Sequence, residues 1–395
     1  MENNARDPKI AVWTGLVKTK ILLIALNLLA GAAFAAVPMP TPAPPELDVK
    51  AYVLVDFDTG KVLAEKEAGM RAEPASLTKI MTVYTVADAL RSGHIKLQDT
   101  PTVSEYAWKQ EGSRMFIDVN KPVSVDELLH GDIIQSGNDA SVALAEHVSG
   151  TEEAFATLMN THAQTLGMSD THFVNSTGLP HPEHYTSAHD LSVLSRALIR
   201  EFPDVYKIFS MREYSYNGIR QHNRNGLLNK DPSADGIKTG HTDSAGYCLV
   251  GSAKREGMRL ISVVMGAESD GARTRASQAL LNYGFRFFET RRLYEDTATV
   301  TDARLWLGAK DTVKLGPAPG SATIVFPRGQ YDKLKASVEL PARLEAPVTQ
   351  GQAMGEVKVE LDGKTVATIP LVAQESVEKG SLIGQWIDRA KLMMQ

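Results

Sequence analysis

Cysteine is nearly absent from this sequence of 395 residues, which holds only Cys248. A single cysteine cannot form a disulfide within the chain, and it excludes zinc sites built on paired cysteines. We expect Cys248 to face the core of a sheet as a small apolar residue. An excess of basic charge is also lacking, because 42 lysines and arginines stand against 47 acidic residues, a formal net charge of −5. This balance argues against a general nucleic-acid-binding protein, and we expect no nucleic-acid partner.

A membrane-spanning run is also missing near the start, where the uncharged run over residues 21–36 is shorter than the roughly 20 residues that a spanning helix needs. Lysines precede this run and small residues close it, a pattern typical of a secretory signal peptide over residues 1–35. An uncleaved membrane anchor is the alternative. The proline-rich segment 36–46 cannot continue a helix and should be a stiff linker. We therefore expect the protein to work outside the cytoplasm.

The composition of the rest, with 43% hydrophobic and 23% charged residues, is that of a packed globular protein. A turn-rich stretch over 56–60 predicts a hairpin over 51–64, and helical periodicity extends from Pro74 to about residue 150. Strand patterns return at 236–239, 246–253 and 259–265, and a helix over 272–284 follows. Strands at both ends with helices between them indicate an α+β domain, which we place at 47–292.

Helical periodicity disappears after residue 294. Short strands are predicted instead, at 297–300, 312–315, 322–325, 335–340, 356–361 and 365–371. The last two are joined by Asp362-Gly363, a typical hairpin turn. These patterns predict a small all-β domain over 293–378.

The C-terminal segment 379–395 has the periodicity of an amphipathic helix. Its apolar side would carry Leu382, Ile383, Trp386, Ile387, Ala390, Met393 and Met394. Such a helix is too short to span a bilayer but could lie in the membrane interface. A helix that docks on its own domain or on a partner fits the same pattern, and periodicity alone does not separate the two.

Three short motifs carry the residues suited to catalysis. They are Ser76-Leu77-Thr78-Lys79, Ser136-Gly137-Asn138 and Lys238-Thr239-Gly240. Ser76 and Lys79 are one helical turn apart, close enough for the amine to take the hydroxyl proton. To act as a base at neutral pH, the pKa of Lys79 must fall by more than about three units, which burial and a neighbouring Lys238 would both favour. Ser136 and Asn138 cannot share a helix face, so we expect a loop to present both.

With these motifs in this order, the chain resembles the low-molecular-mass D-alanyl-D-alanine carboxypeptidases of the penicillin-binding protein and serine β-lactamase superfamily. The resemblance extends over nearly all of the chain from Leu47, including the segments 223–228, 236–242 and 285–288. It implies a β-lactamase/transpeptidase-like domain, a trailing β-rich domain and a C-terminal helix. The match at the C-terminal helix favours membrane attachment over simple docking.

The resemblance also implies roles for the first two motifs. Ser76 would be the nucleophile and Lys79 its base. Ser136 would relay a proton to the departing amine, and Asn138 would hold the substrate amide and the Lys79 side chain. The backbone N–H groups of Ser76 and His241 would form the oxyanion hole.

The strand motif would bind substrate. Lys238 and Thr239 would meet the terminal carboxylate, and Gly240 would leave room for backbone pairing. Arg273 and Arg224 are weaker candidates for steering that carboxylate, and structural ion pairing explains each almost as well.

No cofactor or metal is expected. His181, Glu183 and His184 lack the helix-borne ligand pair of a zinc site, so we expect a solvated loop there. That loop also lacks a glutamate placed to activate a deacylating water as in class A β-lactamases, so rapid β-lactam turnover is not expected.

Together these features predict a periplasmic enzyme, peripherally attached to the inner membrane, that removes the terminal D-alanine from peptidoglycan pentapeptide through an acyl-enzyme on Ser76. β-Lactams would acylate the same serine and stay bound. A DD-endopeptidase or transpeptidase is the alternative within the enzyme class. A non-catalytic scaffold that docks partners at the membrane is the alternative outside it.

Overall fold

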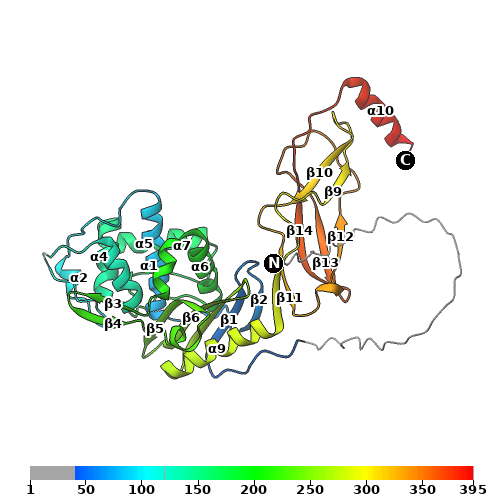
Figure 1. Ribbon diagram of the computed structural model, residues 1–395. Helices are drawn as coiled ribbons and strands as arrows, with labels where there is room; N and C mark the ends of the chain where they lie inside the picture. The colour runs from blue at the N-terminus through cyan, green and yellow to red at the C-terminus, as the bar shows by residue number, and fades with distance from the viewer. Residues whose placement is uncertain (1–40, 120, 395) are drawn as a thin grey trace, which may run out of the picture. The chain divides into compact units, whose positions relative to one another are not determined.

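The computed structural model describes residues 41–119 and 121–394, and the predicted signal peptide lies outside them. The chain divides into a compact unit over Ala43–Thr290 and a second that includes Arg291–Gln395 (Figure 1). Each unit has a hydrophobic cluster of its own.

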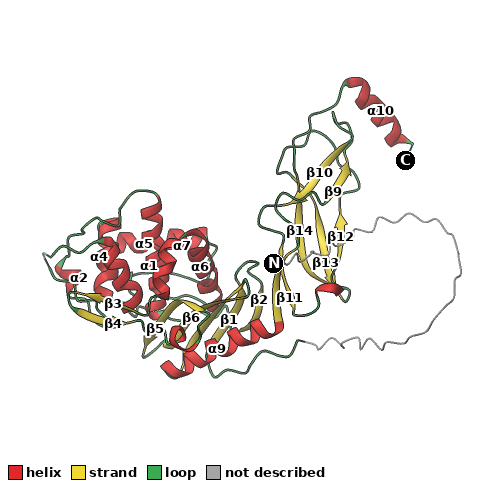
Figure 2. Ribbon diagram, viewed as in Figure 1, coloured by secondary structure: helices red, strands yellow, loops and turns green. Residues whose placement is uncertain are grey.

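The first unit is built on a five-stranded antiparallel sheet with the order β2-β1-β7-β6-β5. Its strands are β1 (Ala51–Asp56), β2 (Val62–Lys66), β5 (Ala234–Thr242), β6 (Gly246–Arg255) and β7 (Met258–Ala267). Every residue of β1 is buried, because helices cover both faces of the sheet (Figure 2). The helix α9 (Asp270–Phe287) lies on one face, and α6 (Ala188–Glu201) belongs to the helical layer on the other. The expected α+β architecture is confirmed.

The helical layer follows the chain from the Ser76 motif onward. It consists of η1 (Ala75–Thr78), α1 (Lys79–Arg91), α2 (Glu105–Trp108), α3 (Val125–His130), η2 (Gly131–Gln135), α4 (Asn138–Ser149), α5 (Glu152–Thr165), α6, α7 (Pro203–Tyr206) and η3 (Lys207–Ser210). The short helix α8 (Leu227–Lys230) lies instead on the α9 side of the sheet, where its N-cap Gly226 packs against Thr274. A small hairpin pairs β3 (Glu213–Tyr216) with β4 (Ile219–His222). At the start of α3, Ser124 and Glu127 form a capping box, in which each side chain binds the other's backbone N–H.

The helix α9 is longer than the sequence suggests, since it extends past Gly284 to Phe287. A Cβ at position 284 would lie 2.5 Å from Leu260 Cδ1 on β7. The glycine is therefore required by close packing of the helix against the sheet and does not end the helix.

The second unit contains a five-stranded antiparallel sheet with the order β12-β13-β14-β10-β9. Its strands are β9 (Thr301–Arg304), β10 (Thr312–Pro317), β12 (Lys335–Glu339), β13 (Ala353–Leu361) and β14 (Lys364–Ala373). A separate pair joins β8 (Phe288–Arg292) to β11 (Thr323–Pro327). Asp362 and Gly363 have φ angles of 49° and 77°, as a tight hairpin turn between β13 and β14 requires.

The prediction of a strand at 297–300 is wrong. The Val300 N–H does donate to Leu315 O, but the continuous ladder with β10 begins only at Thr301. The strand β8 is not predicted by the sequence analysis. This strand follows the helix α9 directly, with no loop between them.

The C-terminal helix α10 (Leu382–Met393) begins at the N-cap Ser381. Its Asp388 is buried and accepts hydrogen bonds from the Leu307 N–H at 2.8 Å and from Arg304 Nη2 at 3.0 Å. The apolar side chains remain exposed, among them Trp386 with 71% of its surface accessible. Within the described ranges, no helix combines the length and hydrophobicity needed to cross a bilayer.

Candidate active site

Ser76 lies in the 3₁₀ turn η1, which directly precedes α1. Pro74, from which the sequence predicts helical periodicity, is the N-cap of this turn. Because a 3₁₀ helix has three residues per turn, side chains at i and i+3 lie above one another. Lys79 therefore faces Ser76, and the Nζ–Oγ distance is 3.2 Å.

Lys79 is fully buried and donates to three oxygens. Besides Ser76 Oγ, Asn138 Oδ1 lies at 2.7 Å and the Thr177 carbonyl at 2.6 Å. Burial lowers the pKa of Lys79 to about 8, although the buried carboxyls of Asp132 and Asp139 oppose this shift. The drop is smaller than the more than about three units that the sequence analysis requires of Lys79 as a base at neutral pH.

The second motif joins η2 to α4. Ser136 follows the last residue of η2 with a left-handed φ of 61°, and its Oγ accepts a hydrogen bond from Lys238 Nζ at 2.9 Å. Asn138 does not lie in a loop as expected, because it is the first residue of α4. The break in the backbone between η2 and α4 lets both side chains reach the same cleft. Asn138 Nδ2 donates a hydrogen bond to the Glu111 carbonyl at 2.6 Å.

The third motif lies on β5, the edge strand of the sheet. Lys238 is buried, and burial and the charge of Lys79 hold its pKa well below the usual range. A Cβ on Gly240 would lie 2.9 Å from the Pro74 carbonyl and 3.2 Å from Ala75 Cβ. Glycine at this position therefore lets the strand pack against the turn η1 that carries Ser76.

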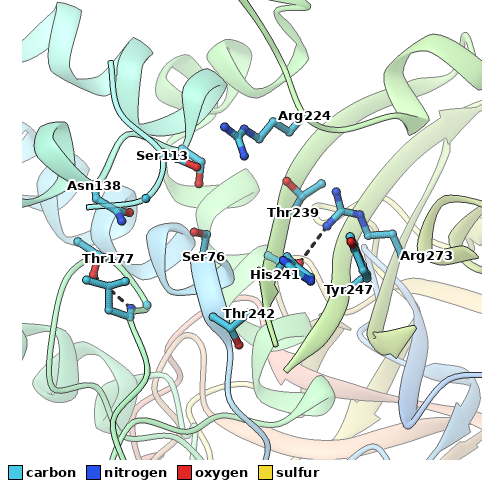
Figure 3. Close-up of a pocket in the computed structure, with 15 residues that line it drawn as sticks. Ser76, Ser113, Asn138, Thr177, Arg224, Thr239, His241, Thr242, Tyr247 and Arg273 are labelled. Atoms are coloured by element: carbon cyan, nitrogen blue, oxygen red, sulfur yellow. Dashed lines mark hydrogen bonds between the residues drawn. The ribbon is translucent and has the colours of Figure 1, made fainter. Parts of the chain in front are cut away.

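These elements enclose an open cleft of about 500 Å³. In Figure 3, Ser76 lies between Asn138 and Thr177 on one side and the strand that carries Thr239 and His241 on the other. The cleft brings together Ser76, Ser136, Asn138, Arg224, Thr239, Gly240, His241 and Arg273 of the predicted residues, while Lys79 and Lys238 lie buried beside it.

The two arginines differ in their surroundings. Arg273 donates to the carbonyls of Gly240 at 2.9 Å and Cys248 at 3.3 Å, and it pairs with Asp270. Its guanidinium is therefore committed to holding β5 and α9 together. Arg224 is exposed at the rim of the cleft, and no hydrogen bond to it is present among the described residues.

Several residues that line the cleft carry no signal in the motifs. They are Gly112, Ser113, Thr177, Gly178, Leu179, Thr242 and Tyr247. The Tyr247 ring packs on the His241 ring with centroids 4.0 Å apart. The pairing of β5 with β6 places these two residues opposite each other, which a correct strand register could have indicated.

The loop at 181–184, which the sequence predicts to be solvated, is only partly exposed to solvent. His181 and Glu183 are exposed, but His184 is 1% exposed and bonded to Thr78 Oγ1 at 2.8 Å. Histidine tolerates burial when both ring nitrogens have partners, a property that spacing alone does not reveal. Across the described ranges, no three His, Cys, Asp or Glu side chains are grouped so that they could hold a metal.

Comparison with known families identifies the family to which the chain belongs. The sequence model of the D-alanyl-D-alanine carboxypeptidase family matches residues 39–269, more than half of the chain. The chain belongs to this family. The model of the C-terminal domain of penicillin-binding protein 5 matches residues 288–379.

Individual relatives of the family agree. The D-alanyl-D-alanine carboxypeptidase DacC of Escherichia coli is 44% identical over 368 residues, which cover 91% of each chain. The crystal structure of penicillin-binding protein 5 from Haemophilus influenzae superposes with a TM-score of 0.82 at 41% identity, covering 86% of this chain and all of that one. An ampicillin-bound structure of penicillin-binding protein D2 from Listeria monocytogenes has a TM-score of 0.57 at 30% identity, covering 61% of this chain and all of that one.

Proposed function

We propose that this serine carboxypeptidase removes the terminal D-alanine from peptidoglycan pentapeptide through an acyl-enzyme on Ser76. The hydrogen-bonded arrangement of Ser76, Lys79 and Asn138 at an open cleft carries the proposal. When Lys79 is neutral, its two N–H groups can remain on Asn138 and Thr177. Its lone pair then points to the Ser76 hydroxyl, so the proton has one direction in which to move.

Attack of Ser76 Oγ on the carbonyl of the penultimate residue forms an ester and breaks the bond to the terminal D-alanine. The leaving nitrogen needs a proton, and the Ser136 hydroxyl, which is hydrogen-bonded to Lys238 Nζ, can supply one. The backbone N–H groups of Ser76 and His241 would hold the oxyanion. Water then hydrolyses the ester and releases the tetrapeptide.

The terminal carboxylate of the substrate would lie at the Thr239 end of the cleft. Thr239 supplies a hydroxyl there, Lys238 a buried amino group beside it, and Arg224 positive charge. We assign Arg224 to steering of the carboxylate and Arg273 to positioning of β5, because only Arg273 is tied to backbone carbonyls.

We also propose that the enzyme acts in the periplasm and attaches to the inner membrane through α10. The signal-peptide pattern supports export. The exposed apolar side chains of α10, which face away from the docked Asp388, support a peripheral membrane contact.

The acyl-enzyme is tested by incubating the protein with benzylpenicillin and measuring the intact mass. We expect one stable adduct that maps to the peptide containing Ser76, and none in Ser76→Ala. Wild-type protein should release free D-alanine from a pentapeptide, and Ser76→Ala should lose at least about 1,000-fold in rate. Modification of another peptide, or full activity of Ser76→Ala, would contradict the proposal.

A further inference from the structure

A loop over residues 173–184 packs directly against the nucleophile turn. The carbonyl of Thr177 on this loop accepts from Lys79 Nζ at 2.6 Å. Gly178 lies so close that a Cβ there would come within 1.8 Å of the Ala75 carbonyl oxygen. The loop therefore touches both the proposed base and the residue before the proposed nucleophile.

His184 is the buried histidine of this loop, and its hydrogen bonds fix its tautomer. The Val174 N–H donates to Nδ1 at 3.1 Å, so Nδ1 is unprotonated and Nε2 carries the hydrogen. The ring packs edge-on against Phe173. Burial lowers the pKa of His184 to about 4, so the ring stays neutral at neutral pH. Positive charge nearby acts in the same direction, from His172, His181 and Lys79.

The Nε2–H of His184 donates to Thr78 Oγ1 at 2.8 Å. The Thr78 hydroxyl in turn donates to the Ala75 carbonyl at 2.9 Å. Ala75 has a φ of 48°, a left-handed conformation that is unfavourable for alanine and needs support from its surroundings.

The Ala75 carbonyl and the Ser76 N–H belong to the same peptide plane and point in opposite directions across it. A hydrogen bond that holds this carbonyl therefore also sets the direction of the Ser76 N–H. We propose that His184 is a positioning residue, which acts through Thr78 to orient the Ala75–Ser76 peptide and so aims the Ser76 N–H at the substrate oxyanion. The inference rests on the proposed acylation of Ser76.

The expected effect is confined to the transition state. An N–H that is turned away from the oxyanion weakens a contact made as negative charge develops, but it leaves binding of the intact ligand nearly unchanged. Loss of the His184 contact should therefore lower the rate constant of acylation by about 10- to 100-fold. The dissociation constant of the initial complex should change by less than about threefold.

Three replacements of His184 separate the two hydrogen bonds. His184→Phe keeps a packed ring and removes both bonds. His184→Gln places an amide near the Nε2 position, where it can donate to Thr78, whereas His184→Asn places one near Nδ1 and can serve only Val174. Each full-length variant is mixed with a fluorescent penicillin in a stopped-flow instrument to obtain the acylation rate constant and the dissociation constant.

We expect His184→Phe and His184→Asn to acylate slowly and His184→Gln to acylate near the wild-type rate. Thr78→Val should reproduce the slow rate without altering the histidine, and the His184→Phe/Thr78→Val double variant should be no slower than the slower single variant. Phe173→Leu is the control for loss of packing: it should lower the melting temperature and leave the acylation rate unchanged.

A wild-type rate in both His184→Phe and Thr78→Val, or equally slow His184→Gln and His184→Phe, would overturn the inference. Failure of the wild-type protein to be acylated at Ser76 would instead overturn the proposed function itself.

Discussion

Asp132 is a buried acid that the proposed mechanism does not use. It lies on η2, where one oxygen accepts from Ser141 Oγ and Oδ2 has no hydrogen-bond partner among the described residues. Burial raises its pKa to about 6, although the charges of Lys79 and Lys238 oppose the shift. Two buried lysines and a carboxyl that is costly to ionise thus lie beside the cleft.

The raised pKa gives stability a defined pH dependence. A carboxyl that binds its proton more tightly in the folded state stabilises the fold below its unfolded pKa, and this contribution is lost as the pH rises through about 6. Asp132→Asn should therefore stabilise the protein at pH 8, by about 3 kcal/mol at most, and give little gain at pH 4. Thermal melts across this range would measure it, with Asp118→Asn, at a partly exposed aspartate, as the control.

The same substitution should affect the reaction. Because the Asp132 carboxylate raises the pKa of Lys79, its removal should shift the acid limb of the acylation rate to lower pH. A stability gain that is equal at pH 4 and pH 8, or an acid limb that moves to higher pH, would contradict this assignment.

At the scale of elements, α10 presents two opposite faces. Asp388 ties one face to the Leu307 N–H and Arg304, while Leu382, Ile383 and Trp386 remain exposed on the helix. Domain docking and membrane contact, which the sequence pattern leaves as alternatives, are therefore compatible in one helix.

The Ile383→Ser/Trp386→Ser double variant should reduce binding to anionic phospholipid vesicles by at least about tenfold in a sedimentation assay, because two large apolar side chains no longer enter the interface. Met211→Ser changes an exposed apolar residue on the other unit and should bind like the wild type. A double variant that still sediments fully would rule out α10 as the anchor, and so would undiminished binding after deletion of 382–395.

The elements also show what a sequence can and cannot predict. The hairpin turn at Asp362-Gly363 depends only on neighbouring residues, so the local pattern is sufficient to predict it. Gly284 falsely indicates the end of a helix, because a glycine is needed there for close packing against Leu260 on another element. The burial of His184 and the cleft position of Thr177 depend on a loop that packs against η1 and α1, and no local pattern records such a contact.

At the scale of the whole molecule, the cleft belongs to one unit. The residues that line it lie between Ser76 and Arg273, and the core beneath it draws only on this unit. The second unit has a separate apolar core between its strands.

A fragment comprising Ala43–Thr290 should therefore fold with one cooperative transition and be acylated by benzylpenicillin within about threefold of the full-length rate. It should not bind vesicles. Circular dichroism melts and the time course of adduct formation would measure these properties. An aggregated or unreactive fragment would mean that the second unit is required for the fold of the first.

The burial of Cys248 has a practical consequence. Its sulfur is sealed in the sheet beside the Gly266 N–H, and burial raises the pKa of its thiol, so the native chain should resist maleimide reagents. A cysteine engineered on the surface of α10 would then be the one reactive handle, and a fluorophore attached there could report insertion into lipid without first mutating the wild-type background.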